Sequence, residues 1–388
     1  MKIVIVCGAG VVSGKEIISL ELAEALLARN EEITVVTSVW ASADFIQRLR
    51  SRRIRYYRFR LGYISATMTF DNIRMTMHQL IYYPKLLVDY WAFLRRERPD
   101  RVIHTNWHHL LLLTPLLRPS RDVFWVHDCM PQTPRYRRLF ALLSRRLRGF
   151  VTVSAAVAKS IRGIGAPESQ IRLIHNGIAD PAEGAPRSVA DRGEVAIGIV
   201  GQIAAWKGHE DLLKAFASLA REFPQTRLQV FGNDDRPFAA ELIRQAAQAG
   251  VAARIVWRGF VRDRKAIYSL LDICAIPSRA EDPFPTTAIE AAFFGLPVVA
   301  TRRGGLPEIV VEGVTGFLVN SERPAELAAR LRELIADEEL RRRFGAAARD
   351  RAATHFTRAR MGEDFELYLH NGAEFRALGD HAEAETVA

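Results

Sequence analysis

Cysteine is scarce in this chain of 388 residues: the three cysteines, Cys7, Cys129 and Cys274, lie far apart and form no Cys-x-x-Cys pair. This spacing argues against a structural zinc site or a disulfide framework, and it favours a reducing compartment such as the cytoplasm. The chain also lacks an apolar run of about 18 residues, so we expect no segment that spans a bilayer. The apolar start, residues 1–10, resembles a short signal peptide, but a helical pattern follows it and we interpret it as a buried strand.

Acidic residues are outnumbered, since 54 Lys and Arg against 44 Asp and Glu give a net charge of +10. This excess favours anionic partners, which include phosphorylated small molecules, acidic glycans, membrane surfaces and nucleic acid. A hydrophobic fraction of 49% excludes wholesale disorder. The chain is longer than one typical hydrophobic core, so two domains are expected.

Short apolar strands alternate with helical stretches, which predicts an α/β fold with parallel, doubly wound sheets. In the first half, a helix is predicted over residues 16–29 and strands over 2–7, 32–37, 101–104, 123–127 and 150–153. After a linker-like stretch near 181–193 the pattern restarts, with strands predicted over 195–200, 227–231, 255–257, 273–276, 297–300 and 317–319.

This pattern predicts four parts. They are an N-terminal Rossmann-like domain over residues 1–185, a C-terminal one over 186–357, a last helix over 358–370 that packs back on the first domain, and a flexible tail over 371–388. Ligands of such sheets bind beyond the carboxyl ends of the strands. We therefore expect the site in a cleft between two facing domains.

No complete nucleotide-binding fingerprint is present. Gly8, Gly10 and Gly14 miss both Gly-x-Gly-x-x-Gly and the P-loop spacing by one residue, and Glu16 stands where a P-loop needs Ser or Thr. A strand–glycine–helix junction still presents backbone N–H groups to an anion, and the alternative is a tight turn alone. The missing fingerprint disfavours a dinucleotide oxidoreductase.

Two stretches of the second half combine charge with predicted strand ends. Lys207 follows strand 195–200, where its ammonium can meet a diphosphate or simply be solvated. Residues 277–292 place two acids in a proline-stiffened loop before a helix. Carboxylates accept hydrogen bonds from sugar hydroxyls, and amides at a helix start suit phosphate oxygens. The alternative is a Thr287-x-x-Glu290 capping box, which would account for Glu290 without a ligand.

The order of these segments resembles the GT-B glycosyltransferases of family 4. GQIAAWKGHEDLLKAF, SRAEDPFPTTAIEAAFFGLPVVAT and RRGGLPEIVVEGVTGFLV are similar to that family's C-terminal half, and SGKEIISLELAEALL, FWVHD, VTVSAAVAKSI and IHNGI to its N-terminal half. The resemblance extends over residues 1–365. It implies the GT-B fold, in which two doubly wound Rossmann-like domains face each other across a cleft.

The resemblance also implies roles for single residues. Glu290 matches the second acid of the family's E-x7-E motif, which holds the ribose hydroxyls. The first acid, beside the donor sugar, then falls on Asp282 or on its neighbour Glu281. Lys207 matches the lysine that binds the diphosphate, whereas Gln202 stands where the family has a second cation, an arginine.

In the first half, His127 matches a histidine beside the donor sugar, and Gly14 matches the second glycine of the family's Gly-Gly-x-Glu loop. Val261, with Phe260, matches the segment that contacts the base. The candidate catalytic residues are therefore His127, Asp282 and Glu281. The candidate donor-binding residues are Gly14, Gln202, Lys207, Val261, Phe284, Pro285, Thr286, Thr287 and Glu290.

The implied activity is that of a retaining hexosyltransferase. It moves a sugar from a nucleotide-diphosphate sugar, with a UDP-sugar favoured, to a glycan or lipid-linked acceptor in cell-envelope or polysaccharide biosynthesis. The chain holds no Asp-x-Asp, which agrees with a family that requires no metal and no other cofactor. Because Gln202 and Asp282 depart from the family pattern, a non-catalytic protein that binds nucleotide sugars or anionic glycans is the alternative.

Two basic stretches lie in the half that is expected to bind the acceptor. Arg48–Arg60 interleaves seven arginines with aromatic residues and contains no acid, and Arg135–Arg148 flanks leucine and phenylalanine residues with cations. They favour an anionic or lipid-linked acceptor and peripheral association of a cytoplasmic protein with the inner face of the plasma membrane. A solvated face is the alternative, and nucleic acid is disfavoured.

Overall fold

The computed structural model describes residues 1–8, 12–62, 70–183, 193–233 and 237–371. The chain divides into two compact units, one of Met1–Gly177 together with the segment from Arg358 onward, and one of Ile178–Thr357. The division after Gly177 precedes the predicted boundary at 185/186, which lies outside the described residues. Of the predicted tail over 371–388, Asn371 belongs to the last helix and the rest lies outside the described residues. Within the described residues, no helix combines the length and the apolar character needed to cross a bilayer.

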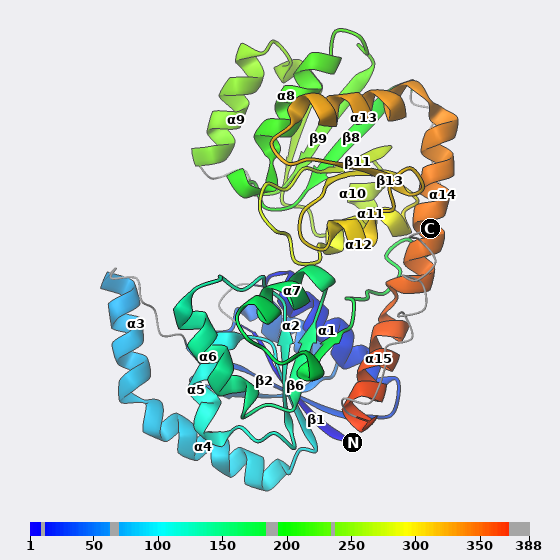
Figure 1. Cartoon of the computed structure of the whole chain (residues 1–388). Coiled ribbons are helices and arrows are strands. Elements are labelled where there is room, and N and C mark those ends of the chain that lie inside the picture. The colour runs from blue at the N-terminus through cyan, green and yellow to red at the C-terminus, as the bar shows by residue number, and fades with distance from the viewer. Residues whose placement is uncertain (9–11, 63–69, 184–192, 234–236, 372–388) are drawn as a thin grey trace. The chain divides into compact units, whose positions relative to one another are not determined.

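The first unit is built on a seven-stranded parallel sheet with the order β3-β2-β1-β4-β5-β6-β7 (Figure 1). Its strands are β1 (Lys2–Val6), β2 (Glu32–Ser38), β3 (Arg55–Phe59), β4 (Arg101–His104), β5 (Asp122–Val126), β6 (Gly149–Thr152) and β7 (Ile171–Leu173). The five predicted strands are confirmed to within one residue at each end, while β3 and β7 were not predicted. Strand β1 is buried from Ile3 to Val6 because helices cover both faces of the sheet.

Helices and short 3-10 turns connect these strands. They are α1 (Gly14–Leu27), α2 (Ala43–Ser51), α3 (Phe70–Ile81), α4 (Tyr83–Glu97), α5 (Trp107–Leu113), η1 (Thr114–Leu116), α6 (Pro134–Ser144), α7 (Ala155–Gly163), η2 (Glu168–Gln170) and, from the end of the chain, α15 (Arg358–Asn371).

The second unit is built on a six-stranded parallel sheet with the order β10-β9-β8-β11-β12-β13. Its strands are β8 (Val195–Val200), β9 (Thr226–Phe231), β10 (Ile255–Gly259), β11 (Ile273–Ile276), β12 (Val298–Thr301) and β13 (Gly316–Val319). Its helices are η3 (Ala205–Lys207), α8 (His209–Leu219), α9 (Pro237–Gln248), η4 (Ala252–Arg254), α10 (Arg264–Tyr268), α11 (Thr286–Phe293), α12 (Leu306–Ile309), α13 (Pro324–Ala336) and α14 (Glu338–His355). All six predicted strands are confirmed to within two residues at each end.

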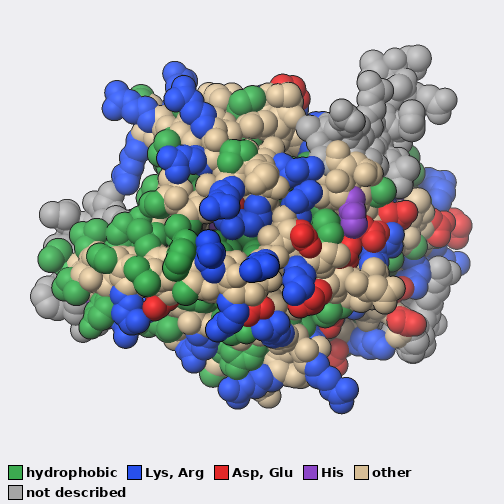
Figure 2. Space-filling view, turned by 90° about the horizontal axis from the view of Figure 1, so that it is seen from below, with side chains coloured by type: hydrophobic (Ala, Val, Ile, Leu, Met, Phe, Trp, Pro, Cys, Tyr) green, Lys and Arg blue, Asp and Glu red, His purple; other side chains and the backbone are tan. Residues whose placement is uncertain are grey.

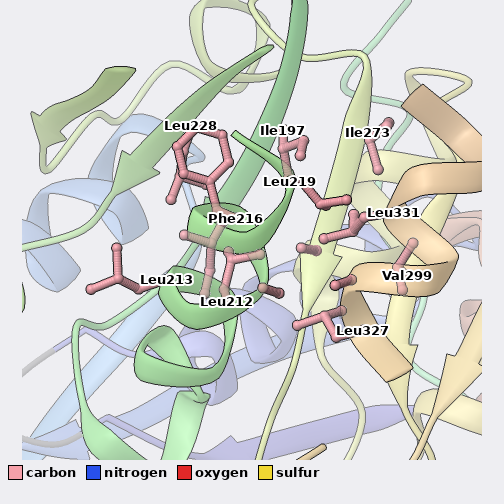
Figure 3. Packing of buried hydrophobic residues seen from close by; sticks show 14 of the residues in the cluster. Ile197, Leu212, Leu213, Phe216, Leu219, Leu228, Ile273, Val299, Leu327 and Leu331 are labelled. Atoms are coloured by element: carbon pink, nitrogen blue, oxygen red, sulfur yellow. The ribbon is translucent and has the colours of Figure 1, made fainter. Parts of the chain in front are cut away.

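An apolar core holds the second sheet rigid. Helix α8 buries Leu212, Phe216 and Leu219, which are spaced as i, i+4 and i+7 and therefore share one helix face. Leu327 and Leu331 of α13 belong to the same cluster, and Figure 3 shows both helices directing these side chains toward the strands. This packing fixes the carboxyl ends of the strands, from which the loops of the site leave.

Helix α15 returns to the first unit after the chain has built the second. Its Phe365 is fully buried and meets Trp125 of β5 edge to face, with ring centroids 4.8 Å apart. At the start of the helix, Arg358 pairs with Glu21 and Glu24 of α1 at 2.6 and 2.8 Å. Apolar and ionic contacts therefore attach α15 to the first sheet and to α1.

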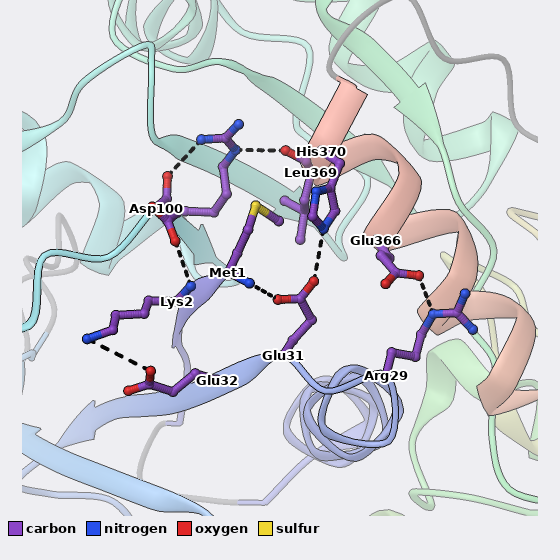
Figure 4. Close-up of polar contacts among 10 residues, drawn as sticks. Met1, Lys2, Arg29, Glu31, Glu32, Asp100, Glu366, Leu369 and His370 are labelled. Carbon is purple, nitrogen blue, oxygen red and sulfur yellow. Dashed lines mark hydrogen bonds and ion pairs between the residues drawn. The ribbon is translucent and has the colours of Figure 1, made fainter.

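Polar contacts attach the far end of α15 as well (Figure 4). His370 Nε2 lies 2.9 Å from Oε1 of Glu31, the residue before β2, and Glu366 pairs with Arg29. Arg101 Nε donates a hydrogen bond of 2.9 Å to the Leu369 carbonyl. The C-terminal helix is consequently an integral part of the first unit.

Phe365→Ala should destabilise the first unit by about 3–5 kcal/mol, because removing a buried aromatic ring leaves a cavity. Amide hydrogen exchange should become faster in β4–β6 and stay unchanged in β8–β11. The matched variant Phe216→Ala should have the opposite pattern. Faster exchange in both units of Phe365→Ala would contradict the assignment of α15 to the first unit alone.

Candidate functional site

The second sheet has its topological switch point between β8 and β11, because the strand order runs outward from these two in opposite directions. Loops that leave the carboxyl ends of such strands diverge and leave a crevice in which ligands bind. Lys207 comes from the loop after β8, and Asp282 from the loop after β11. The Lys207 ammonium donates a 2.6 Å hydrogen bond to Asp282 Oδ2, and both side chains are largely buried. The structure thus brings together two residues that lie 75 positions apart in the sequence.

The two loops are locked to each other behind this ion pair. Arg279 binds the Asp211 carboxylate through two hydrogen bonds of 2.7 Å, and its backbone N–H donates to the Trp206 carbonyl at 2.7 Å. Gly208 adopts a φ of +75°, and a Cβ there would lie 1.8 Å from the Pro277 carbonyl oxygen. Only glycine permits this close approach of the two loops.

Glu290 is the second buried acid at this edge of the sheet. Its Oε1 accepts a 2.7 Å hydrogen bond from Arg264 Nε, and its Oε2 accepts one of 2.9 Å from the Tyr268 hydroxyl. Burial, together with the nearby Glu290 carboxylate, raises the pKa of Tyr268, so this hydroxyl stays protonated and donates. Two donors from α10 therefore hold the Glu290 carboxylate in a defined orientation.

The predicted capping box of Thr287 and Glu290 is wrong. Pro285 precedes the helix in an extended conformation and α11 begins at Thr286, so Thr287 already lies inside the helix. The Glu290 carboxylate accepts hydrogen bonds from Arg264 and Tyr268 of α10. The buried Thr287 hydroxyl has no hydrogen-bond partner within the described residues. A buried hydroxyl beside the amides of a helix start suits an anionic ligand.

The neighbouring acids Glu281 and Asp282 occupy different environments. Asp282 is buried against Lys207, whereas Glu281 is exposed, pairs with Arg303 at 3.2 Å and accepts a hydrogen bond from the Gly304 N–H. Gly304 has a φ of +55°, and a Cβ there would lie 1.9 Å from the Asp282 carbonyl oxygen. The turn at Gly304 thus keeps the two carboxylates apart.

The remaining candidates of this unit lie along the same edge of the sheet. Gln202 is exposed after β8, and Val261 is half-buried after β10, next to Phe260, which is 70% exposed. Phe284 is buried and meets the Phe356 ring edge to face, with centroids 5.7 Å apart. The Phe284 ring therefore anchors the loop between β11 and α11 in the interior of the second unit.

In the first unit, His127 follows β5 beside the switch point between β1 and β4. Its ring is buried 4.3 Å from the Trp125 ring, and its Nε2 has no hydrogen-bond partner within the described residues. Burial, and secondarily the Lys15 ammonium, lower the pKa of His127 well below its usual range. A neutral imidazole with an unused nitrogen can exchange a hydrogen bond with a ligand hydroxyl.

For the glycine loop before α1, the sequence left two interpretations open, an anion-binding junction and a tight turn. Residues 9–11, which include Gly10, lie outside the described residues, whereas Ser13 caps α1 and forms a capping box with Glu16. Gly14 opens the helix, and a Cβ there would meet nothing within 4 Å. The capping box therefore accounts for the start of α1, while the space beside Gly14 remains open to a ligand.

The sequence prediction missed two residues at this edge, His108 and His109, which lie in α5, four and five residues after the end of β4. Burial, Lys15 and Arg135 lower the pKa of His108 to about 4. Burial, followed by the charges of Lys15, His108 and His104, lowers that of His109 to about 3. The sequence contained a signal for them, since the two histidines stand about one helical turn after the end of the predicted strand 101–104.

The structure revises both basic stretches. In Arg48–Arg60, several guanidinium groups pair with acids, among them Arg52 with Glu24 at 2.8 Å and Arg55 with Glu97 at 2.9 Å. The stretch is divided among α2, a turn and β3, so it forms no single basic face.

In Arg135–Arg148, Phe140 and Leu143 are fully buried in the core and unavailable to a membrane. Arg135, Arg137 and Arg138 of α6 are exposed and pair with no acid within the described residues.

Comparison with known proteins agrees with this architecture. Residues 12–180 match the family described as Glycosyltransferase Family 4, and residues 185–351 match Glycosyl transferases group 1. The fold is similar to that of Anabaena Alr3699/HepE, solved in complex with UDP, with a TM-score of 0.79, 21% identity and coverage of 95% of this chain and 100% of that one. A complex of the same Anabaena protein with UDP-glucose gives a TM-score of 0.77 at 21% identity, covering 95% and 99% of the two chains.

The two doubly wound units thus define a GT-B glycosyltransferase fold, and the chain belongs to the family-4 glycosyltransferases. Among curated relatives, the D-inositol 3-phosphate glycosyltransferase of Corynebacterium efficiens is 39% identical over 165 residues, which cover 40% of this chain and 38% of the relative. The chain spans less than half the length of the curated relatives that it matches.

The buried histidines make the stability of the first unit depend on pH. Because their pKa values are lowered in the folded chain, the unfolded chain binds their protons more readily. The stability is therefore complete above about pH 6.5 and falls as the pH decreases toward the folded values, by up to about 1.4 kcal/mol per pH unit for one histidine. His109→Gln should reduce this slope when the free energy of unfolding is measured between about pH 7.5 and 5. Equal slopes in the wild type and the variant would contradict the role of His109.

Proposed function

We propose that the protein is a retaining hexosyltransferase that uses a nucleotide-diphosphate sugar. The observation that carries this proposal is the Lys207–Asp282 pair at the switch point of the second sheet, close along the chain to the start of α11. Membership of the family-4 glycosyltransferases supports the class of reaction. The UDP and UDP-glucose complexes of the similar Anabaena protein support a UDP-sugar as the donor.

The diphosphate leaves with negative charge, which the Lys207 ammonium and the amides at the start of α11 stabilise. An ammonium has three donors, so Lys207 can retain Asp282 and still bind phosphate oxygens. Because these groups supply the counter-charge, we propose that the reaction requires no metal ion and no other cofactor. Of the two neighbouring acids, we assign Asp282 to the donor sugar, since Glu281 is exposed and engaged by Arg303.

The remaining groups orient the donor. Glu290, held by Arg264 and Tyr268, accepts hydrogen bonds from the ribose hydroxyls. The start of α11 at Thr286 and Thr287 faces the phosphates, and Val261 and Gln202 border the nucleotide. His127 stays neutral and exchanges a hydrogen bond with a sugar hydroxyl.

We propose a glycan or lipid-linked acceptor, used in cell-envelope or polysaccharide biosynthesis on the cytoplasmic side of the membrane. The net charge of +10 and the exposed arginines of α6 support an anionic acceptor and peripheral association with an anionic membrane.

A thermal-shift screen with UDP-, GDP- and ADP-sugars would identify the donor, because a ligand that binds the folded state alone raises the melting temperature.

With that donor, Lys207→Ala and Asp282→Asn should lower turnover by about 10²–10³-fold, the effect of removing one group that stabilises developing charge. The matched variant Glu281→Gln should keep turnover within about threefold of the wild type. Melting temperatures of all variants must accompany the rates, because Lys207→Ala leaves a buried carboxylate unpaired. Donor binding without any hydrolysis or transfer would favour the non-catalytic alternative, and equal losses for Glu281→Gln and Asp282→Asn would contradict the assignment of Asp282.

The stereochemistry provides an independent check. With an α-linked donor sugar, the product should carry an α linkage, which one-dimensional proton NMR reads from the anomeric coupling constant. A β-linked product would contradict the retaining mechanism while leaving the donor site intact.

A further inference from the structure

Three arginines lie at the amino edge of the first sheet, the edge opposite to the one that carries His127. Arg101 opens β4, Arg148 directly precedes β6 and Arg172 lies in β7. Figure 2 looks onto the first unit from the side on which β1 begins, and it shows Lys and Arg side chains grouped near the middle of this face. We propose that Arg101, Arg148 and Arg172 form a binding site for a phosphate group. This arginine site does not depend on the proposed transferase activity.

The register of the strands aligns the backbone positions of the arginine site. Val102, the residue after Arg101, pairs with Asp122 of β5. The Arg148 N–H donates a 2.7 Å hydrogen bond to the carbonyl of the same Asp122, and Arg172 is the second residue of the neighbouring strand β7. Because parallel strands begin at the same edge of a sheet, arginine side chains that start there can reach one another.

Tyr368 of α15 is the group near which the three arginines converge. Its hydroxyl packs against the start of β6, where a Cβ on Gly149 would lie 2.6 Å from the Tyr368 oxygen. Arg101 Nε donates a 2.9 Å hydrogen bond to the carbonyl of the residue after Tyr368 (Figure 4). Burial raises the pKa of Tyr368 to about 12, although the charges of all three arginines act to lower it. The hydroxyl is therefore a protonated donor close to three cations.

Several guanidinium donors of the arginine site have no acceptor in the described part of the chain. The Nε groups of Arg148 and Arg172 are buried there without a hydrogen-bond partner, and neither residue pairs with an acid among the described residues. Arg101 uses Nε and Nη1 on backbone carbonyls, and no hydrogen bond is formed by its Nη2 within the described residues. Buried N–H donors without an acceptor are rare in folded proteins, and a bound ion is one of the groups that satisfies them.

The acids that act on these arginines are bound elsewhere. Glu168 binds Arg162 through both carboxylate oxygens, and Asp100 accepts a 2.7 Å hydrogen bond from a backbone N–H of β1. Burial, followed by the charge of Arg148, lowers the pKa of Arg101. The guanidinium groups are thus close enough to repel one another, and an anion between them would relieve this repulsion.

A phosphate group matches these donors better than a carboxylate or a chloride ion. Each guanidinium is a planar fork of donors that suits phosphate oxygens. A phosphate carries a charge of about −1.5 to −2 at pH 7 and has at least three acceptor oxygens, whereas a carboxylate brings one charge and two oxygens. We therefore commit to a phosphate group, supplied either as inorganic phosphate or as the end of a phosphate ester.

A phosphate bound here should join the last helix to three strands. Arg101 of β4 already holds the end of α15, while Arg148 and Arg172 come from β6 and β7. The bound phosphate should therefore stabilise the first unit and slow amide hydrogen exchange in α15.

The test compares melting temperatures in inorganic phosphate, in glycerol 3-phosphate and in chloride at equal ionic strength. The wild type should melt at a higher temperature in phosphate than in chloride, since a ligand of the folded state stabilises it. The variant carrying Arg148→Gln and Arg172→Gln should have an apparent phosphate affinity at least about tenfold lower, because it loses charge-assisted hydrogen bonds. In chloride this variant should melt within about 3 °C of the wild type, which shows that it is folded.

Two control variants separate the arginine site from other sources of phosphate binding. Lys207→Gln removes the cation of the proposed donor site and should keep the phosphate-induced shift. The variant carrying Arg118→Gln and Arg145→Gln loses the same charge from two exposed positions of the first unit, and its apparent affinity should stay within about twofold of the wild type. Phosphate should slow amide exchange in α15, β6 and β7 of the wild type but not of the Arg148→Gln, Arg172→Gln variant.

The outcomes are distinct. A shift that is lost in the Arg148→Gln, Arg172→Gln variant and kept in Lys207→Gln supports the proposal, and the two phosphate compounds then show whether the free ion or an ester is preferred. If phosphate raises the melting temperature of the wild type no more than chloride does, the arginine site is wrong. It is equally wrong if the shift is lost in Lys207→Gln and kept in the arginine variant, because phosphate then binds the donor site. The transferase is tested separately, by turnover with nucleotide sugars.

Discussion

The ion pair between Lys207 and Asp282 is the contact on which the site depends. Two largely buried charges at 2.6 Å require each other, because removing one partner of such a pair typically costs about 3–5 kcal/mol. The pair exists because the loops after β8 and β11 are held together by Arg279 and by the close approach at Gly208. The Lys207 ammonium is thereby held in one position, which makes it a preorganised hydrogen-bond donor at this edge of the sheet.

The two units share one topological feature, a switch point in the strand order of the sheet. In each, the strand order reverses direction between two central strands, β1 and β4 in the first sheet and β8 and β11 in the second. Parallel pairing then delivers every functional candidate to the carboxyl edge of its own sheet: His127 in the first unit, and Lys207, Asp282 and Glu290 around one edge of the second. The apolar strands behind them carry no chemistry, but their burial is what makes the positions of the loops reproducible.

Much of this was predictable from sequence, and the failures have physical causes. Continuous apolar runs in the sequence predicted eleven strands. Strand β3 was missed because it is a half-exposed edge strand whose arginines break the apolar pattern. The capping box failed because the N-cap of α11 is Pro285, two residues before Thr287. The choice between Glu281 and Asp282 was left open because it depends on Arg303 and Gly304, whose contacts no local pattern encodes.

Net charge is the property that sequence reasoning located least well, and its distribution decides which surface can meet an anion. The densest run, Arg48–Arg60, is divided among elements whose acids neutralise several of its arginines, so a high count there produces little potential. The same holds on helix α4, where Lys85 pairs with Asp89 at 3.1 Å and Arg96 pairs with Glu97 at 3.0 Å. Whether a basic run creates a potential is therefore decided by the acids that folding places beside it, which a local count of charges does not show.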